Sequence, residues 1–150
     1  MSSEIATRYC DKCHAMFYDG ATVKGVCPAG GGHHAQGLRF EIPTEKPETA
    51  VGQPNWRICG KCYATFYDGY ADKGPCPAGG AHRQGSANIL LQHDRPETST
   101  AQAHWRYCDK CHVVFYNGYT DKGRCAGGGG HQAQGLQFVL PHIPVGVPID

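Results

Sequence analysis

The sequence predicts an all-β protein that consists of three copies of one small module. Two observations lead to this prediction. The same pattern of residues recurs every 49 positions, as Cys10, Cys59 and Cys108 illustrate, and a fixed period of this kind marks each copy as one structural unit. Within each copy, short runs of alternating apolar and polar residues lie between glycine-rich and proline-rich turns, and no stretch has the apolar spacing of a helix.

The repeat also sets the expected domain boundaries. The copies occupy residues 1–49, 50–98 and 99–141, and a proline-rich arm occupies residues 142–150. Segments of equal length, rich in Pro, Glu and Thr, join the copies and have the composition of linkers. Equal linkers are compatible with three independent units and with a closed packing around a pseudo-threefold axis, as in a trefoil. Each copy has a strand with an apolar face that needs a packing partner, so we expect the closed arrangement.

The composition argues against several classes of protein. Of the 150 residues, 40% are hydrophobic, which is too many for a chain that is disordered throughout. The net charge is +1, whereas proteins that grip nucleic-acid phosphates or anionic membranes are usually strongly basic. The first residues lack the basic and apolar segments of a secretory signal. Nine cysteines without such a signal fit a reducing compartment, so we expect the protein in the cytoplasm, or released without a signal peptide.

The first expected element of each copy is a short aromatic strand that ends in a tight turn. In the first copy, Met16-Phe17-Tyr18 precede Asp19-Gly20. Asp-Gly and Asn-Gly are strong signals for a two-residue hairpin turn, because that turn needs a positive φ at both central positions. The sequence therefore predicts hairpin turns at Asp19-Gly20, Asp68-Gly69 and Asn117-Gly118.

The second expected element is a half-buried strand near the end of each copy. Leu38, Phe40 and Ile42 alternate with polar residues in the first copy, and this period of two is typical of a strand with one apolar face. The third copy offers Leu136, Phe138 and Leu140, and the middle copy offers Ala87, Ile89 and Leu91. Gln84 arrives one residue earlier in its copy than Gln36 and Gln134 do in theirs, which predicts a bulge or an altered loop there.

Each copy also contains three cysteines and one histidine at fixed spacing. The pattern is C-x2-C, then 13 residues, then C-x5-H. Zn²⁺ favours four such ligands in a tetrahedron, and Cys₃His is one of its standard structural sets. We therefore expect three Zn²⁺ ions per chain. The expected ligands are Cys10, Cys13, Cys27 and His33 in the first copy, Cys59, Cys62, Cys76 and His82 in the second, and Cys108, Cys111, Cys125 and His131 in the third.

Other uses of these cysteines fit the pattern less well. Disulfide pairing would leave one odd thiol in every copy, and a redox C-x2-C motif would lack its usual βαβ surroundings. The nitrogen ligand disfavours an iron–sulfur cluster. A unit of about 49 residues buries little apolar surface and needs a metal staple. Four protein ligands leave no position open for an activated water, which predicts a structural role. In the first copy, the spacing favours His33 over the neighbouring His34 as the fourth ligand.

The C-x2-C turn that leads into a β-hairpin resembles the knuckle of zinc ribbons and rubredoxin-type sites. Residues 27–33 and 76–82 share the signature Cys-Pro-Ala-Gly-Gly-x-His, whereas the third copy has Ala126-Gly127 in place of Pro-Ala. This signature is similar to tandem repeats of uncharacterised microbial proteins. The resemblance covers about thirty residues of each copy and implies a zinc-supported β unit, without implying an activity.

Residues other than the metal ligands also recur in all three copies. Phe17 and its equivalents Phe66 and Phe115 are expected in the core, beside the metal. Neighbours on a strand point to opposite faces, so we expect the adjacent tyrosines on the surface, in a small pocket suited to a sugar ring. The candidate ligand-binding residues are Tyr18, Asp19, Lys24 and Gln36, then Tyr67, Asp68, Lys73 and Gln84, then Tyr116, Asn117, Lys122 and Gln134. The simpler interpretation is that they are turn residues with a solvated lysine.

These residues lead to three classes of function. We expect a non-catalytic multivalent protein that binds glycans in the manner of a lectin, because repeated weak sites gain avidity on a repetitive ligand. The alternative is a zinc-ribbon-type adaptor for nucleic acid or protein, with a basic strip that includes Arg8, Arg57 and Arg106. Acidic residues interrupt that strip in every copy. An enzyme is not expected, since no catalytic constellation or phosphate-binding loop is present. The sequence predicts no particular oligomeric state.

Overall fold

The computed structural model describes residues 4–45, 48–85 and 88–143, and these residues form only β-strands, turns and loops. The strands are β1 (Glu4–Cys10), β2 (Met16–Tyr18), β3 (Ala35–Pro43), β4 (Gly52–Ile58), β5 (Thr65–Tyr67), β6 (Ile89–Gln92), β7 (Ala101–Cys108), β8 (Val114–Tyr116) and β9 (Ala133–Pro141). They pair into three antiparallel sheets of three strands, one per repeat. The expected all-β class is confirmed.

The first strand of each repeat is the central strand of its sheet. The sheet orders are β2-β1-β3, β5-β4-β6 and β8-β7-β9. β1 pairs with β2 through Thr7↔Tyr18 and with β3 through Thr7↔Phe40. The turn between β1 and β2 is therefore the metal-binding knuckle around Cys10 and Cys13, and the long glycine-rich loop connects β2 to β3 on the other side.

The expected hairpin turns at the Asp-Gly and Asn-Gly pairs are wrong. β2 pairs with β1, which precedes it, and not with β3, which comes after it, and Gly20 has no positive φ. The glycine is required for a different reason. A Cβ at Gly20 would overlap the ring of Tyr18, and the same holds for Gly69 under Tyr67 and for Gly118 under Tyr116. A pattern typical of a tight turn thus marks a place where a tyrosine folds over its own backbone.

The expected alternation of the third strand is confirmed in the first repeat. Phe40 and Ile42 are buried, while Arg39 and Glu41 remain partly exposed. The equivalent strand β9 buries Phe138 and Leu140, and β6 buries Ile89 and Leu91; the candidate strand residue Ala87 lies outside the described residues. The predicted irregularity in the middle repeat is also present. Gln84 bridges to Cys59, whereas Gln36 pairs with Tyr9 and Gln134 pairs with Tyr107.

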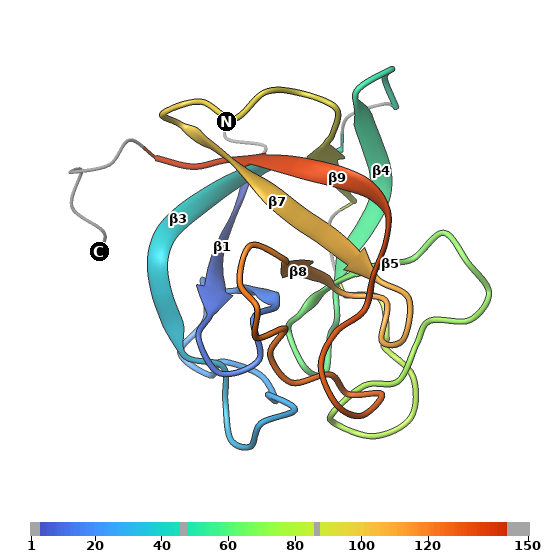
Figure 1. Ribbon diagram of the computed structural model, residues 1–150. Helices are drawn as coiled ribbons and strands as arrows, with labels where there is room; N and C mark the ends of the chain where they lie inside the picture. The colour runs from blue at the N-terminus through green and yellow to red at the C-terminus, as the bar shows by residue number, and fades with distance from the viewer. Residues whose placement is uncertain (1–3, 46–47, 86–87, 144–150) are drawn as a thin grey trace.

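The three sheets pack against one another in a closed ring with pseudo-threefold symmetry (Figure 1). At the knuckle end, equivalent bridges join successive repeats, including Phe17↔Ala64, Phe66↔Val113 and Ala15↔Phe115. At the other end the bridges are Thr44↔Ile89, His93↔Phe138 and Phe40↔His142. Each repeat therefore contacts both others. Of the two arrangements that equal linkers allow, the structure has the closed packing and not three independent units.

The interior consists of two clusters along this ring. The first, here called the metal layer, contains the nine cysteines, Ala15, Ala64, Val113 and the three phenylalanines Phe17, Phe66 and Phe115. The second, here called the aromatic layer, contains Met16, Phe40, Ile42, Trp56, Ile58, Ile89, Leu91, Trp105, Val114, Phe138 and Leu140. The three recurring phenylalanines are fully buried, as expected. Small side chains beside the cysteines let the three metal-binding loops gather at one end of the molecule, which is the lower end in Figure 1.

The predicted arm begins between the third repeat and the first. His142 donates its backbone N–H to Thr100 O at 2.9 Å, and Ile143 donates to Arg39 O at 3.0 Å. The remainder of the arm lies outside the described residues. Among the residues that the structure describes, no helix reaches the length and apolar character that crossing a membrane requires.

Candidate metal centres and inter-repeat pockets

The expected ligands of each repeat come together in one buried cluster. In every cluster the three sulfurs and one histidine nitrogen lie within 4.8 Å of one another. Cys10 Sγ and Cys27 Sγ are 3.9 Å apart, and Cys13 Sγ is 3.5 Å from His33 Nδ1. The corresponding distances are 3.9 and 3.5 Å in the second repeat and 3.8 and 3.4 Å in the third. Each Cys₃His group could hold one metal ion.

The knuckle holds the first two sulfurs by local hydrogen bonds. Cys10 donates its backbone N–H to Ala15 O at 3.0 Å, and His14 donates to Cys10 O at 2.8 Å. Backbone N–H groups also point at the sulfurs: His34 donates to Cys10 Sγ and Ala29 donates to Cys27 Sγ, both at 3.4 Å. Such donors stabilise the thiolate, which is the form of cysteine that binds a metal ion.

The neighbouring groups already favour ionised sulfur at these sites. Hydrogen bonds from the other thiols of the cluster hold the pKa of Cys10 and Cys108 well below the ordinary value. A hydrogen bond from Cys62 is the main cause that lowers the pKa of Cys76 to about 7. Hydrogen bonds to the other thiols and burial raise the pKa of Cys13 and Cys62, and burial is the main cause that raises the pKa of Cys111. Each cluster therefore offers at least one thiolate near neutral pH, and a bound cation would favour ionisation of the others.

The histidine ligand joins its own metal centre to the next repeat. Its ring stacks on the phenylalanine of β2, with Phe17 and His33 centroids 4.8 Å apart at 20°. While Nδ1 faces the sulfurs, Nε2 donates to the Cys62 carbonyl of the second repeat at 2.9 Å. His82 bonds to Cys111 O and His131 bonds to Cys13 O at the same distance. An outer bond of this kind fixes the tautomer and the ring orientation of a metal ligand.

A glycine makes this close approach between repeats possible. Gly25 has a φ of 74°, and a Cβ there would overlap the Cys62 carbonyl. Gly74 makes the equivalent contact with Cys111: a Cβ at Gly74 would lie 2.6 Å from the Cys111 carbonyl oxygen. The backbone that leads to the third cysteine of one repeat thus rests directly on the knuckle of the next.

The structure separates the two adjacent histidines of the first repeat. His33 is buried among the sulfurs. His34 is exposed, and its Nδ1 lies 3.1 Å from the Asp11 carboxylate. Of the two, His33 is the histidine that joins the cluster, which is the position that the spacing favours.

Half of the candidate ligand-binding residues form ion pairs or loop contacts instead of lining a pocket. Lys24 Nζ lies 2.9 Å from Asp19 Oδ1, and Lys73 Nζ lies 2.9 Å from Asp68 Oδ1. Lys122 Nζ donates to the backbone carbonyl of Asn117 at 2.9 Å. These pairs close the loop after each second strand, in agreement with the simpler interpretation of these residues.

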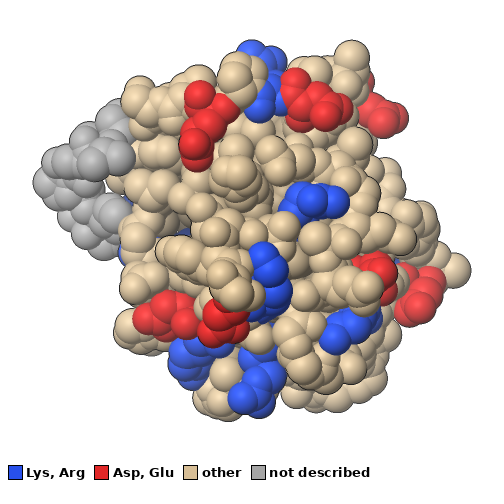
Figure 2. Space-filling view, viewed as in Figure 1, with Lys and Arg blue, Asp and Glu red and all other residues tan. Residues whose placement is uncertain are grey.

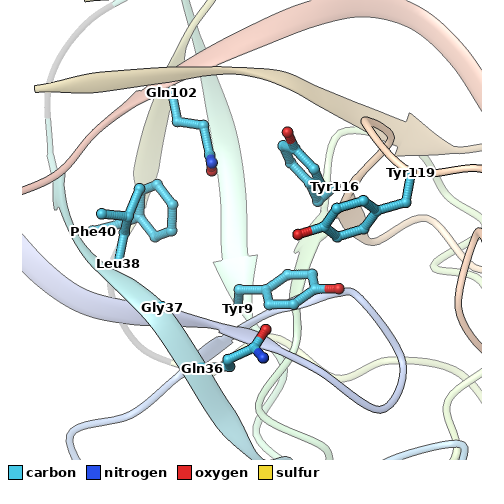
Figure 3. Close-up of a pocket in the computed structure, with 8 residues that line it drawn as sticks. All are labelled: Tyr9, Gln36, Gly37, Leu38, Phe40, Gln102, Tyr116 and Tyr119. Carbon is cyan, nitrogen blue, oxygen red and sulfur yellow. The ribbon is translucent and has the colours of Figure 1, made fainter. Parts of the chain in front are cut away.

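All the candidate tyrosines and two of the three candidate glutamines line pockets, and where both residue types line one pocket they come from different repeats. Tyr116 of the third repeat and Gln36 of the first line one pocket together with Tyr9, Tyr119 and Gln102 (Figure 3). Gln102 reaches into this pocket from one side and Gln36 approaches from the opposite side, while Phe40 and Leu38 form an apolar wall. The sequence pattern groups such residues within one copy, because nothing local indicates which copies become neighbours.

The equivalent pocket lies between the third and second repeats. Tyr67 and Gln134 line it together with Tyr70, Tyr107 and Gln53. The ring geometry is also repeated: Tyr116 and Tyr119 centroids are 5.1 Å apart, as are those of Tyr67 and Tyr70. We call these the 3/1 pocket and the 2/3 pocket. Six of their tyrosines and glutamines were not among the sequence candidates, namely Tyr9, Gln53, Tyr70, Gln102, Tyr107 and Tyr119, although each recurs at the same position in two of the three copies.

The third boundary, between the first and second repeats, is different. Tyr18 lies there beside Tyr63, Ile58 and Gly85. Gln84 is exposed and does not line the hollow. Residues at this boundary thus keep one of the tyrosines and none of the glutamines.

One tyrosine of the strand that faces each pocket has a raised pKa. Burial, followed by the nearby Tyr119, raises the pKa of Tyr9 above its ordinary value. Burial and Tyr70 do the same for the pKa of Tyr107. Because neither pocket is lined by a charged side chain among the described residues, both present neutral donors and acceptors.

Charged side chains are spread over the surface without a continuous patch of one sign on the face shown in Figure 2. Several basic side chains have partners inside the fold. Arg8 donates to Gly37 O at 3.0 Å, and Lys24 pairs with Asp19.

Comparison of the chain with family models, curated proteins and solved structures finds no match. The molecule carries three repeated Cys₃His groups, each in a three-stranded antiparallel sheet.

Proposed function

We propose that this is a non-catalytic, multivalent carbohydrate-binding protein whose fold is held by three structural Zn²⁺ ions. The observation that carries the ligand assignment is the pair of equivalent, uncharged pockets rich in tyrosine and glutamine. The observation that carries the metal assignment is the geometry of the Cys₃His clusters.

The cluster distances support zinc. Tetrahedral Zn²⁺ has Zn–S bonds of about 2.3 Å and Zn–N bonds of about 2.0–2.1 Å, which place two sulfurs about 3.8 Å apart and sulfur and nitrogen about 3.5 Å apart. The Cys10–Cys27 and Cys13–His33 distances are 3.9 and 3.5 Å. The ligand set and its closed, buried form are those of structural zinc.

A structural role also follows from the completeness of the site. Three sulfurs and one imidazole fill a tetrahedron, so no position remains for a water or substrate. The ligands are at most 6% exposed. Structural zinc contributes on the order of 10–16 kcal/mol of apparent binding free energy, which is large for repeats this small.

Carbohydrate suits the pockets because a sugar ring has an apolar C–H face and several hydroxyl groups. Tyr119 and Tyr70 are 52% and 53% exposed and offer aromatic surface on which such a face can stack. Gln36, Gln102 and the phenols supply neutral hydrogen-bond partners around it. A small number of placed polar groups beside apolar surface gives a pocket its orientation and specificity.

The adaptor for nucleic acid is less well supported. Its basic strip would need unpaired cations, yet Arg8 lies 3.8 Å from Asp19 and Arg57 lies 3.8 Å from Asp68. Phosphate binding of this type weakens steeply with salt.

Metal analysis and a glycan array on the metal-loaded chain test the proposal. We expect about three zinc ions per chain and binding to neutral glycans that persists between low and moderate salt. A metal-free but folded protein would overturn the zinc assignment. An empty array, or nucleic-acid binding that disappears with salt, would overturn the carbohydrate assignment.

A further inference from the structure

Each of the two pockets is built from two halves that belong to different repeats. One half, the tyrosine half, consists of the tyrosine of the second strand, a second tyrosine three residues later and a glutamine from the first strand. It is present as Tyr67, Tyr70 and Gln53 in the second repeat and as Tyr116, Tyr119 and Gln102 in the third. The other half, the strand half, is present as Tyr9 and Gln36 in the first repeat and as Tyr107 and Gln134 in the third.

The tyrosine half depends on a local irregularity in the first strand. β7 carries a register shift between Gln102 and Trp105, where His104 has a φ of 76°. This shift lets Gln102 Oε1 accept a hydrogen bond from Trp105 Nε1 at 2.9 Å, so the Gln102 amide nitrogen remains available to a ligand in the pocket. β4 has the same shift and the same bond, from Trp56 Nε1 to Gln53 Oε1 at 3.0 Å.

The first repeat has no tyrosine half. β1 pairs with β3 without this shift, from Ile5↔Ile42 to Thr7↔Phe40. Thr7 replaces the tryptophan, and Ala21 stands where the other repeats have Tyr70 and Tyr119.

The second repeat has no strand half. Ile58 occupies the position of Tyr9 and Tyr107, and Gly85 occupies that of Gln36 and Gln134. A Cβ at Gly85 would come within 2.5 Å of Ile58 O, so this backbone leaves no room for the glutamine.

The two missing halves meet at the same boundary. The 3/1 and 2/3 boundaries each combine a tyrosine half with a strand half, while the 1/2 boundary combines neither. All three boundaries nevertheless keep the metal cluster and the histidine bond to the next knuckle. A hollow of about 350 Å³ remains at the 1/2 boundary, but it contains neither the tyrosine half nor the strand half. The ring therefore closes with and without these two halves, and their residues are surplus to what closure requires.

The pockets also restrict the ligand. Their volumes are about 100 Å³ and 210 Å³, below the range of about 300–1,000 Å³ typical of sites that enclose a drug-sized molecule. Each is open to solvent and lined without charge. These properties suit one neutral ring that enters from the end of a chain.

Resting on the proposed carbohydrate-binding function, we infer that this protein is bivalent: the 3/1 and 2/3 pockets are two equivalent sites for a terminal neutral sugar ring, and the 1/2 boundary has no site. Two sites on one rigid body bind a dense sugar surface with avidity that can exceed the single-site affinity by about 10²–10⁴.

The test is an NMR and calorimetric titration of the full, zinc-loaded chain. The probes are the methyl glycosides of galactose, mannose, glucose and N-acetylglucosamine, with that of N-acetylneuraminic acid as the charged comparison. Tyr119→Ala removes the exposed ring of one pocket and Tyr70→Ala removes that of the other. Val23→Ala, which truncates an exposed apolar side chain of the first repeat, is the matched control. Zinc content and near-UV circular dichroism establish that each variant is folded.

We expect at least one neutral glycoside to bind with two equivalents per chain. Each tyrosine variant should leave one equivalent, the double variant should bind at least tenfold more weakly, and Val23→Ala should keep two. Single variants should also lose about 100-fold in retention on a dense sugar surface.

Different failures have different meanings. If a neutral glycoside binds with three equivalents, or if the tyrosine variants leave binding unchanged, bivalency is overturned while carbohydrate binding stands. If only the charged glycoside binds, the ligand class is wrong. If no glycoside perturbs the folded, zinc-loaded chain, the proposed function is overturned together with this inference.

Discussion

The metal layer and the aromatic layer differ in how closely the three repeats agree. In the metal layer, the four ligands, the phenylalanine stacked on the histidine and the bond to the next knuckle are the same in every repeat. In the aromatic layer, Thr7 stands where the other repeats have tryptophan, and Ile89 stands where they have phenylalanine.

The contrast indicates which interactions close the ring and which distinguish the repeats. A metal cluster needs four ligands at fixed distances and loses its ion if one is missing. An apolar core accepts other side chains as long as total volume and pattern are kept. In the metal layer the only difference among the core residues named above is Val113 in place of Ala15 and Ala64. The larger differences lie in the aromatic layer, and the two pockets lie at its rim.

Removal of the metal should have the largest effect on the stability of the fold. A strong chelator is expected to unfold the protein, because small repeats bury little apolar surface and a structural zinc ion, as proposed here, typically contributes roughly 10–16 kcal/mol. Circular dichroism and a colorimetric zinc assay follow the process together. A chelated chain that kept its native spectrum would show that the aromatic layer is sufficient alone.

The adjacent histidines of the first repeat provide a matched pair. His33→Ala removes a ligand, the stack on Phe17 and the bond to Cys62, so we expect zinc content to fall from three to two and stability to fall by more than about 4 kcal/mol. His34→Ala, on an exposed side chain, should change stability by less than about 0.5 kcal/mol. Thermal unfolding and zinc content measure both, and equal effects would contradict the assignment of the ligand.

Two glycines of the second repeat separate backbone strain from contact between repeats. Both Gly74 and Gly79 have a positive φ, but only Gly74 faces a neighbouring backbone, that of Cys111. Gly79→Ala should cost about 1–2 kcal/mol, the usual penalty of an L-residue in this region. Gly74→Ala should cost about 2 kcal/mol more, because the added methyl group separates the second repeat from the third. Chemical denaturation of the zinc-loaded variants measures the difference, and equal costs would argue against a tight contact.

A phenylalanine-to-isoleucine substitution, made once in each layer, tests the comparison with smaller changes in stability. Phe115→Ile removes the ring that stacks on His131 at 4.7 Å and is expected to cost about 2–3 kcal/mol. Phe138→Ile introduces the residue that the second repeat already has at this position, Ile89, and should cost less than about 1.5 kcal/mol. If the second substitution proved the more damaging in thermal unfolding, the aromatic layer would be the stricter of the two.

Much of the metal layer could be predicted from the sequence. The ligands recur at fixed spacing, and metal chemistry assigns the same role to each copy. The alternation of Leu38, Phe40 and Ile42 likewise identifies a strand with one buried face. These features are local, so one copy contains all the information they need.

The strand order and the pockets depend on contacts that a single copy does not contain. The sequence marks Gly20 as a turn residue because the ring that covers it, that of Tyr18, has no signature in the sequence. Tyr116 and Gln36 share a pocket only because the third repeat lies beside the first. A repeat pattern shows which residues are equivalent, whereas their neighbours are set by the way in which the ring closes.

The hydrogen bond from His131 to Cys13 joins the last repeat to the first with the same length and partners as the bonds between repeats that are consecutive in the chain. The contacts between repeats are thus the same whether or not the two repeats follow one another in the chain. Three separate peptides, each with the sequence of one repeat, would satisfy every junction of the ring as a homotrimer. In such a trimer all the boundaries would be identical, so a peptide based on the third repeat, which alone carries both pocket halves, would form three pockets.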